Sequence, residues 1–349
     1  MVRVLHAMAG APHGGAEAFF ERLVIALHRA GVPQSVLIRR DPGRAARLGA
    51  AGLAPVQAPF GGAFDFTTPG VFKREIQRFR PDIVLTWMNR ATAFCPSGDF
   101  VHAARLGGYY DLKYYRFCDH LIGNTDDIVR YLTKQGWPAP RAHMVPNFVS
   151  GETAPPELRG AHDTPEGAPL VLALGRLHTN KGFDTLLRAL ALTPGAYVWL
   201  AGEGPERAKL AALASELGIS DRVRWLGWRA DIAPLFAACD IFVCPSRHEP
   251  LGNVVLDAYA HERAVVATRS QGPSALIEDE VSGLLTPIDD APALAAAISR
   301  LSADRALAAR LAAAGHTVWR ENYCEEIVVA KYLALFERLA RTHSATGER

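Results

Sequence analysis

The sequence predicts an α/β protein with two consecutive domains, each built on a parallel sheet. Its 349 residues are too many for one hydrophobic core and about right for two domains of roughly 150 residues. Along both halves, short apolar runs alternate with stretches of helical periodicity. A segment rich in proline, glycine and charge separates the two series, so a linker is expected at residues 149–169.

The first domain, residues 1–148, opens with a βα unit. An apolar run suited to a buried strand is followed by a glycine-rich turn and then by apolar residues at helical spacing. The same alternation continues toward the middle of the chain. The expected elements are strands at 2–8, 35–39 and 83–87, and helices at 16–30 and near 71–79.

The second domain, residues 170–320, repeats this alternation, and residues 321–349 are expected to form a helix that returns toward the first domain. Parallel sheets bind ligands at the carboxyl ends of their strands, so the site of two Rossmann-like domains is expected in the cleft between them. The expected strands are 170–174, 197–201, 223–226, 241–244, 264–267 and 283–285, followed by helices at 291–301 and 305–314.

The composition is that of an ordinary globular protein, with 49% hydrophobic and 21% charged residues. No apolar stretch approaches the ~18 residues of a membrane-spanning helix, and the N-terminus is too short for the apolar region of a signal peptide. The five cysteines are scattered and show no zinc-site spacing. We therefore expect a cytoplasmic protein.

Charge is distributed unevenly along the chain. Residues 1–148 contain 18 Lys and Arg against 11 Asp and Glu, whereas residues 149–349 contain 20 against 25. A basic first half suits an anionic acceptor or an anionic membrane surface, and diffuse surface charge is the alternative. No nucleic-acid motif accompanies the charge, so nucleic acid is not expected as a partner.

One expected helix of the basic half carries three cations, Lys73, Arg74 and Arg78. We expect these cations to meet anionic lipid, which would make the protein peripheral at the inner face of the membrane. The apolar residues beside them face either lipid or the domain core. These residues are Val71, Phe72, Ile76 and Phe79.

Two segments place phosphate-binding chemistry at the ends of strands. Gly14 and Gly15 follow the first strand and open the first helix, where bare backbone N–H groups and the helix dipole favour a phosphate, although a simple tight turn has the same pattern. In the second domain, Arg176 and Lys181 follow the strand 170–174. A planar guanidinium and a point charge together suit a diphosphate.

A third segment, residues 245–258, joins two carboxylates to a helix start. Pro245 and Pro250 forbid a regular helix before about Leu251, so the helix is expected to begin at Gly252 and Asn253. Glu249 then precedes the helix N-terminus and Asp257 lies inside the helix. Such acids can hold the two ends of an elongated ligand whose phosphate meets the helix N-terminus; the alternative is a pre-helical acid and a surface acid.

Taken together, these segments resemble the retaining glycosyltransferases of the GT-B fold, family four. The resemblance runs nearly the full chain and rests on motifs in a fixed order. They are Gly14-Gly15, Val145-Pro146-Asn147, Gly175-Arg176-Leu177 with Lys181-Gly182, Ala201-Gly202-Glu203-Gly204-Pro205, and Asp240 through Glu249-Pro250-Leu251-Gly252 into a Glu-x7-Glu motif whose second acid is here Asp257.

The resemblance implies roles for these residues. Arg176 and Lys181 would neutralise the leaving diphosphate, Glu249 would lie near the donor sugar, and Asp257 would hold the ribose hydroxyls. Asp257 is one methylene shorter than the usual Glu, so the ribose contact is the departure from the pattern. Gly14, Gly15, Leu251, Gly252 and Asn253 complete the implied donor site.

The first domain supplies the implied acceptor side. The family places a His near the donor sugar at the end of a strand, and His102 is the nearest candidate, with a structural histidine as the alternative. Acceptor contacts are expected from Asn89 and Arg90, which follow the strand 83–87, and from Tyr109 and Lys113 in an aromatic-basic run, for which a packed helix face is the alternative.

The sequence therefore predicts a metal-independent transferase with no cofactor, which moves a sugar from a nucleotide-diphosphate donor to a glycan or lipid-linked acceptor of the cell envelope. Two other functions fit the same fold: a sugar-nucleotide epimerase, and a non-catalytic sugar-nucleotide-binding protein. Product analysis separates the first from a transferase. Donor hydrolysis or transfer excludes the second.

Overall fold

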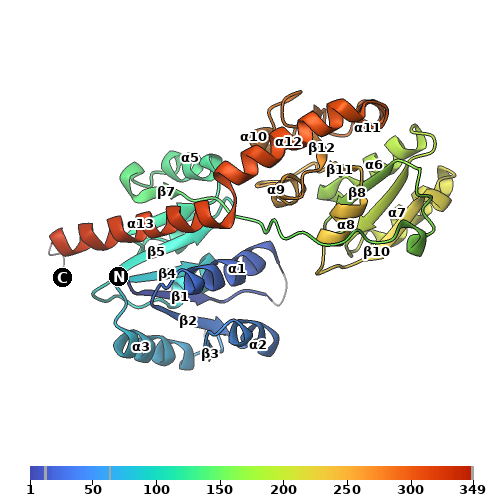
Figure 1. The fold of residues 1–349 in the computed structure, drawn as a ribbon. Coiled ribbons are helices and arrows are strands. Elements are labelled where there is room, and N and C mark those ends of the chain that lie inside the picture. The colour runs from blue at the N-terminus through green and yellow to red at the C-terminus, as the bar shows by residue number, and fades with distance from the viewer. Residues whose placement is uncertain (12–13, 63, 347–349) are drawn as a thin grey trace. The chain divides into compact units, whose positions relative to one another are not determined.

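The computed structural model describes residues 1–11, 14–62 and 64–346, which form two compact units (Figure 1). The first unit comprises Met1–Phe148 and Glu325–Arg349, and the second comprises Val149–Cys324. Each unit is built on one sheet, with seven strands in the first and six in the second, and every strand pair is parallel.

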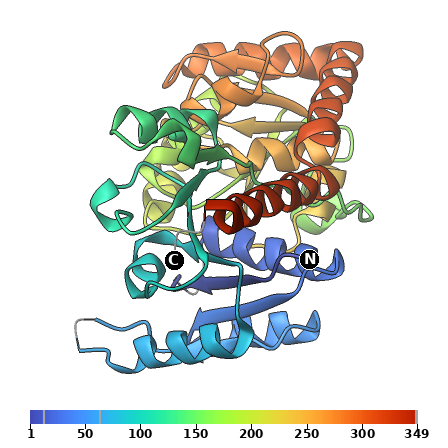
Figure 2. The same cartoon turned by 90° about the vertical axis from the view of Figure 1, so that its left-hand side faces the viewer.

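The first unit has the strand order β3-β2-β1-β4-β5-β6-β7. Its helices cover both faces of the sheet, as Figure 2 shows from a second direction. The strands are β1 (Val4–Met8), β2 (Gln34–Arg39), β3 (Val56–Ala58), β4 (Ile83–Trp87), β5 (Val101–Leu106), β6 (His120–Gly123) and β7 (Ala142–Met144), and the helices are α1 (Gly15–Arg29), α2 (Pro42–Ala50), α3 (Thr67–Phe79), α4 (Met88–Phe94), α5 (Asp126–Lys134) and α13 (Glu325–Thr346).

Alternation along the strands explains why helices cover both faces. In β1, Val4 and Met8 join a core that contains residues of α1 and α13, whereas Leu5 and Ala7 join a core that contains residues of α3 and α4. All of these side chains are buried, because a parallel sheet covered on both sides has no wet face. An almost continuous apolar run is the sequence pattern of such a strand.

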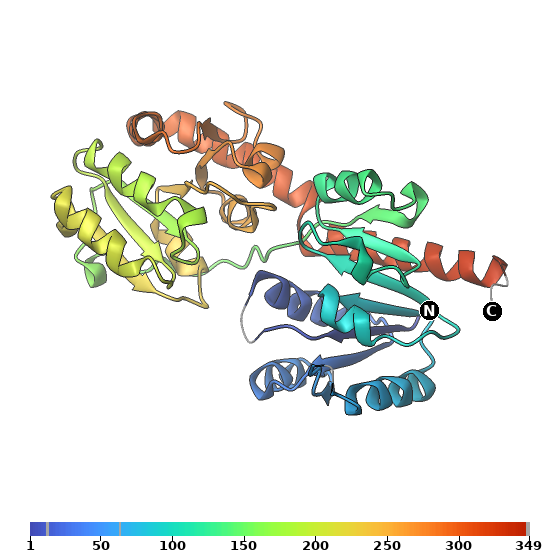
Figure 3. The same cartoon turned by 180° about the vertical axis from the view of Figure 1, so that it is seen from behind.

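The second unit, drawn from behind in Figure 3, has the strand order β10-β9-β8-β11-β12-β13. Its sheet is also buried between two apolar cores. The strands are β8 (Leu170–Leu174), β9 (Tyr197–Ala201), β10 (Val223–Gly227), β11 (Ile241–Cys244), β12 (Ala264–Thr268) and β13 (Leu284–Thr286), and the helices are α6 (Phe183–Ala191), α7 (Arg207–Glu216), α8 (Ala233–Ala238), α9 (Asn253–Ala260), α10 (Gln271–Leu276), α11 (Ala291–Ala303) and α12 (Arg305–Asn322).

Among the elements expected within residues 1–320, two boundaries differ by more than two residues from the sequence-based expectation. The helix expected near 71–79 begins at Thr67, and the helix expected at 305–314 continues to Asn322. The earlier start has a local cause, since the Asp65 carboxylate accepts the backbone N–H groups of Thr67 and Thr68 at 3.0 and 2.9 Å.

The segment expected as a linker is packed onto the second unit. Arg159 reaches Asp240 at 3.1 Å, Arg229 donates to Glu157 at 2.7 Å, and the Trp199 indole donates to Thr164 at 2.9 Å. Buried or half-buried polar groups are therefore paired along this segment, and Thr164 itself is buried.

Arg105 fastens the C-terminal helix to the first sheet. Arg105 is 3% exposed, and its guanidinium donates to the Tyr332 hydroxyl of α13 at 2.6 Å and to the Asn147 amide oxygen at 2.5 Å. The cation also lies 4.8 Å from the centroid of the Phe19 ring of α1. One buried side chain thus joins β5, α1, α13 and the end of the chain segment that leaves this unit.

The helices of the described part of the chain are too short or too polar to span a bilayer.

We predict that Tyr332→Phe lowers the free energy of unfolding by about 1.5–3 kcal/mol, because the change removes an acceptor from a buried charged group. Urea denaturation followed by circular dichroism measures the effect. Tyr114→Phe, at a partly exposed tyrosine of the same unit, serves as the control and is expected to change stability by less than about 0.5 kcal/mol. Equal stability of the Tyr332→Phe variant and the unmodified chain would show that the Arg105 contact is dispensable.

Candidate active site

The candidate donor site of the second unit lies where strand order reverses. β8 and β11 are neighbours, and the loops that follow their carboxyl ends lead to α6 and α9, which belong to the two different cores of the sheet. Open parallel sheets bind ligands at such a reversal. The loop after β8 contains Arg176 and Lys181, and the loop after β11 contains Glu249.

The loop after β8 presents its cations at the end of a buried strand. Arg176 is exposed and forms no ion pair with the carboxylates that the structure describes. Lys181 ends the short 3₁₀ turn Thr179–Lys181, and Gly182 then caps α6 with φ of 63°. A Cβ atom on Gly182 would lie 2.0 Å from the Pro245 carbonyl oxygen, so glycine lets the two loops approach closely.

The loops after β8 and β11 are tied together by backbone and side chains. The N–H groups of Arg247 and His248 donate to the Asn180 carbonyl at 2.8 and 3.2 Å. The Lys181 ammonium donates to the Glu249 carboxylate, and these side chains are 23% and 12% exposed. The structure thus brings together two residues that are 68 positions apart in the sequence.

Arg247 braces this arrangement. Its guanidinium donates to both carboxylate oxygens of Asp184 at 2.8 and 2.7 Å and lies 2.6 Å from Asp289. Hydrogen bonding to Asp184 raises the pKa of Arg247. Because two carboxylates already neutralise Arg247, we assign it a positioning role. Sequence reasoning did not single it out, and its place two residues before Glu249 was the available signal.

Helix α9 begins at Asn253, four residues after Glu249. Gly252 caps the helix with φ of 80°, and its N–H lies 3.4 Å from the Glu249 carboxylate. Asn253 and Asp257 are four positions apart and therefore share one face of α9, where both are partly exposed. Leu251 is buried and anchors the entry to the helix.

The chemistry of this edge suits a bound diphosphate with a polar group on either side. Two cations and the N-terminus of α9 favour negative charge. Glu249 stands just before this terminus and Asp257 stands one turn inside it. The structure brings Lys181 and Gly252 into contact with Glu249, and Arg176 lies on the same loop as Lys181, after β8.

The first unit has a matching reversal between β1 and β4. Gly14 and Gly15 lie at the start of α1, immediately after the loop from β1, and both are exposed. The buried Glu17 carboxylate accepts the Ala11 N–H at 2.8 Å and so shapes this loop from inside. Residues 12 and 13 lie outside the described part of the chain.

The expected acceptor residues follow β4 and β5. Asn89 accepts a hydrogen bond from the Tyr115 hydroxyl, and Arg90 donates to the Phe60 carbonyl at 3.3 Å. The Tyr109 hydroxyl donates to Asp127. Burial is the larger cause and this hydrogen bond the second, and together they raise the pKa of Tyr109 to about 12. Lys113 pairs with Asp111 at 2.8 Å.

His102 lies apart from these residues. β5 spans Val101–Leu106, so His102 is at the amino end of the strand and Leu106 is at the carboxyl end. Its Nε2 lies 3.0 Å from the Thr86 hydroxyl, and its ring is buried. This placement matches the alternative of a structural histidine and gives no support to a role at the sheet edge where ligands bind.

Comparisons with known proteins agree along both units. A family model described as "Glycosyltransferase Family 4" matches residues 13–152, and one described as "Glycosyl transferases group 1" matches residues 168–304. Two proteins of Rhizobium meliloti (strain 1021) named as lipopolysaccharide core biosynthesis glycosyltransferases are similar to the chain. LpsE is 39% identical over 92% of this chain and 95% of its own, and LpsD is 37% identical over 97% and 98%.

A solved structure also resembles this one. Anabaena HepE, crystallised in complex with UDP and glucose, superposes with a TM-score of 0.84 at 21% sequence identity and covers 97% of this chain and 100% of its own.

We predict that His102 makes stability depend on pH. Burial lowers the pKa of His102 from 6.5 to about 4, so the unfolded chain binds a proton that the folded chain does not. The stabilisation is complete above pH 6.5 and is lost as pH falls toward 4, by up to about 1.4 kcal/mol per pH unit. His6 and His143, whose pKa values burial lowers to about 3 and about 4, add to the wild-type slope.

In urea denaturation between pH 7 and pH 4, His102→Asn is expected to show a shallower loss of stability than the wild type. The variant His28→Asn, at an exposed histidine, is expected to keep the wild-type slope. Parallel curves for His102→Asn and the wild type would contradict the burial of a neutral imidazole.

Proposed function

This chain belongs to the glycosyl transferases of group 1, and from that premise we propose that it transfers a sugar from a nucleotide-diphosphate donor to a lipopolysaccharide core acceptor, with retention of anomeric configuration. The GT-B fold predicted from the sequence is confirmed. The observation that carries the proposal is the cluster of Arg176, Lys181, Glu249 and the α9 N-terminus at one sheet edge.

The donor diphosphate would meet this cluster. The ion pair between Lys181 and Glu249 holds the ammonium beside the α9 N-terminus before any ligand binds. A diphosphate offers Lys181 a stronger, doubly charged partner, while Glu249 is left to accept from hydroxyl groups of the sugar. HepE was solved with UDP and with glucose, which supports a uridine nucleotide as the first donor to test.

The chemical step needs charge stabilisation at the leaving group. The bond between the anomeric carbon and the β-phosphate oxygen breaks, and its electron pair goes to the diphosphate. The acceptor hydroxyl forms the new bond on the same face and gives its proton to the departing oxygen. Arg176, Lys181 and backbone N–H groups are preset for the negative charge that develops, which is the largest contribution that such a site makes.

The acceptor would lie against the first unit. LpsE and LpsD are named for lipopolysaccharide core biosynthesis and match the chain over nearly its full length, which supports an acceptor of that class. Residues 1–148 contain 18 basic and 11 acidic residues, and this basic excess suits an anionic acceptor. A panel of UDP-, GDP- and ADP-sugars, read by thermal shift and by transfer to core oligosaccharide, tests the proposal. If none of these sugars stabilises the protein, the proposal is rejected.

We predict that Arg176→Ala and Lys181→Ala each lower kcat by ~10²-fold or more, because each removes a charge-assisted contact to the leaving diphosphate. The assay is release of the nucleoside diphosphate in the presence of acceptor. Lys209→Ala, at an exposed lysine of the same unit, controls for loss of positive charge and is expected to keep wild-type turnover. If either variant keeps wild-type turnover, the residue that it replaces does not stabilise the leaving group.

We predict that excess EDTA leaves the rate of transfer unchanged, because Arg176 and Lys181 supply the positive charge that a divalent ion supplies elsewhere. The comparison uses enzyme dialysed against EDTA and the same enzyme with Mg²⁺ or Mn²⁺ restored. A rate that falls with EDTA and recovers with either ion would assign part of the catalysis to a metal.

A further inference from the structure

The loop between β3 and α3 holds two aromatic rings out in water. Phe64 is 89% exposed and Phe66 is 83% exposed. Apart from Met1, these are the most exposed large apolar side chains in the part of the chain that the structure describes. Burial of an aromatic ring is among the most favourable contributions to folding, so two neighbouring rings that forgo it point to a partner surface.

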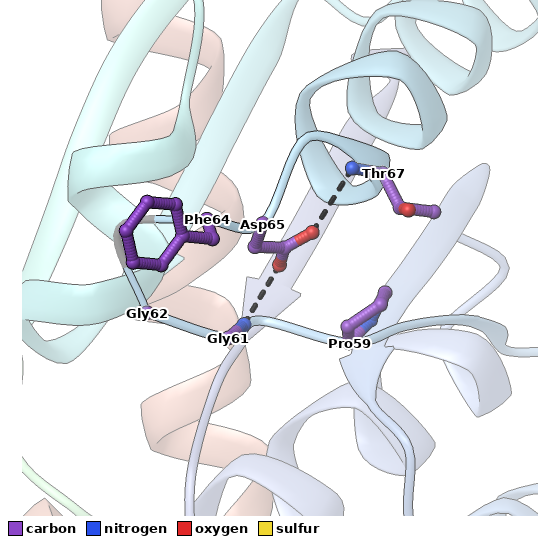
Figure 4. A pocket seen from close by; sticks show the side chains of 6 residues that line it. All are labelled: Pro59, Gly61, Gly62, Phe64, Asp65 and Thr67. Atoms are coloured by element: carbon purple, nitrogen blue, oxygen red, sulfur yellow. Dashed lines mark hydrogen bonds between the residues drawn. The ribbon is translucent and has the colours of Figure 1, made fainter.

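Hydrogen bonds keep the loop in this shape. The Asp65 carboxylate accepts the N–H groups of Gly61 at 2.7 Å and Thr67 at 3.0 Å, while the Phe64 ring points away from this carboxylate (Figure 4). Asp65 also accepts the Thr68 hydroxyl at 2.5 Å, and these contacts, led by the one from that hydroxyl, lower the pKa of Asp65 to about 2.

The base of the loop is anchored in the core. Phe60 is buried, and its N–H donates to the Thr68 hydroxyl at 2.9 Å. A shallow hollow of about 420 Å³ lies beside the loop and is lined by Pro59, Gly61, Gly62, Phe64, Asp65 and Thr67. The rings are therefore presented by a braced loop that starts at the buried Phe60.

Helix α3 continues this surface with positive charge. Its buried side chains are Thr68, Phe72, Glu75 and Phe79. At about 100° per residue, Phe66 and Lys73 project from the opposite side, with Arg74 next to them. Lys73 and Arg74 are exposed, and Glu75, the only carboxylate in the α3 sequence, faces the core.

The structure settles one alternative for this helix and corrects one expectation. Phe72 and Phe79 are buried, and Val71 and Ile76 pack against the same core, so none of the four is available to lipid. Arg78 pairs with the buried Glu75, so it has a structural partner. The lipid-facing apolar residues would instead be Phe64 and Phe66, which precede the helix.

We propose that Phe64, Phe66, Lys73 and Arg74 form a membrane-docking surface for an anionic bilayer. The two rings enter the interface between headgroups and acyl chains, and the two cations meet lipid phosphates. A bilayer fits better than a protein partner because the apolar tips lie beside two exposed cations. The two nearby carboxylates are engaged within the protein, Asp65 by backbone N–H groups of its own loop and Glu75 by Arg78. The exposed cations are thus complementary to anionic lipid. The inference rests on the proposed function, since a lipid-linked acceptor must be reached at a membrane.

The test uses the full chain and sedimentation with vesicles of phosphatidylglycerol and phosphatidylcholine in equal parts. Phe64→Ser/Phe66→Ser is expected to weaken binding about tenfold or more at every salt concentration, because apolar insertion is not screened. Lys73→Gln/Arg74→Gln is expected to weaken binding by about fivefold per residue at low salt and by much less at high salt. Vesicles of phosphatidylcholine alone should bind the wild type weakly.

Matched controls come from the second unit. Leu158→Ser removes another side chain that is 75% exposed, and Lys209→Gln/Arg305→Gln removes two exposed cations. Both control variants should bind vesicles as the wild type does. Phe64→Trp, compared with Leu158→Trp, should show a blue shift in emission and quenching by brominated lipid.

Three results would overturn the proposal. The wild type fails to bind anionic vesicles even at low salt; or the Phe and Lys/Arg variants bind as tightly as the controls; or analytical ultracentrifugation shows a dimer that Phe64→Ser/Phe66→Ser dissociates, in which case a second copy covers the rings.

Failure of the proposed function gives a different result. The Phe64→Ser/Phe66→Ser variant should keep wild-type transfer to water-soluble, delipidated core oligosaccharide and lose transfer only to acceptor embedded in vesicles. If no variant transfers sugar to either acceptor, the proposed function is wrong, and vesicle binding still decides the docking surface.

Discussion

Each unit depends on one topological constraint, the reversal of strand order beside its first strand. β1 lies between β2 and β4, and β8 lies between β9 and β11, so the loops after neighbouring strands diverge and leave backbone groups uncovered at the carboxyl edge. The two loops pass close to one another at this edge, so glycine is needed at the point of contact. Gly182, which lies against the Pro245 carbonyl, is such a glycine. The polar motifs of the second unit gather at this edge because the strands that carry them are adjacent in the sheet although they are distant in the sequence.

The cations at the reversal between β8 and β11 form ion pairs, and these pairs differ in whether the cation can still bind a ligand. Arg247 is held by Asp184 and Asp289, so its charge is neutralised by the fold. Among the described carboxylates, Lys181 pairs only with Glu249, which is partly exposed and can turn to another donor. Together with Arg176, which pairs with no described carboxylate, Lys181 can therefore give its charge to a ligand. One arginine braces the loops, and the other two cations remain ready for an anion.

Patterns that depend on local chemistry could be predicted from the sequence, and those that depend on tertiary burial could not. Gly182, Pro245 and Pro250 interrupt apolar runs, so the loops after β8 and β11 and the start of α9 near Asn253 were found in advance. The burial of Glu75, which engages Arg78, could not be read from charge alone. His102 was the nearest candidate for the histidine that the family places at the end of a strand, but β5 runs four residues beyond it, because Ala103, Ala104 and Leu106 continue the buried pattern.

The exposure of Phe64 and Phe66 could not be predicted from the sequence either. In the sequence, Phe64 and Phe66 look like core residues, because large apolar side chains are usually buried. Asp65 lies between them, its carboxylate accepts the N–H groups of Thr67 and Thr68 at the start of α3, and its two neighbours lie on the outside. A loop of glycine without this cap could fold back and bury the rings against the body of the unit. The braced loop removes that freedom, so an apolar surface outside the protein is what remains to cover the two rings.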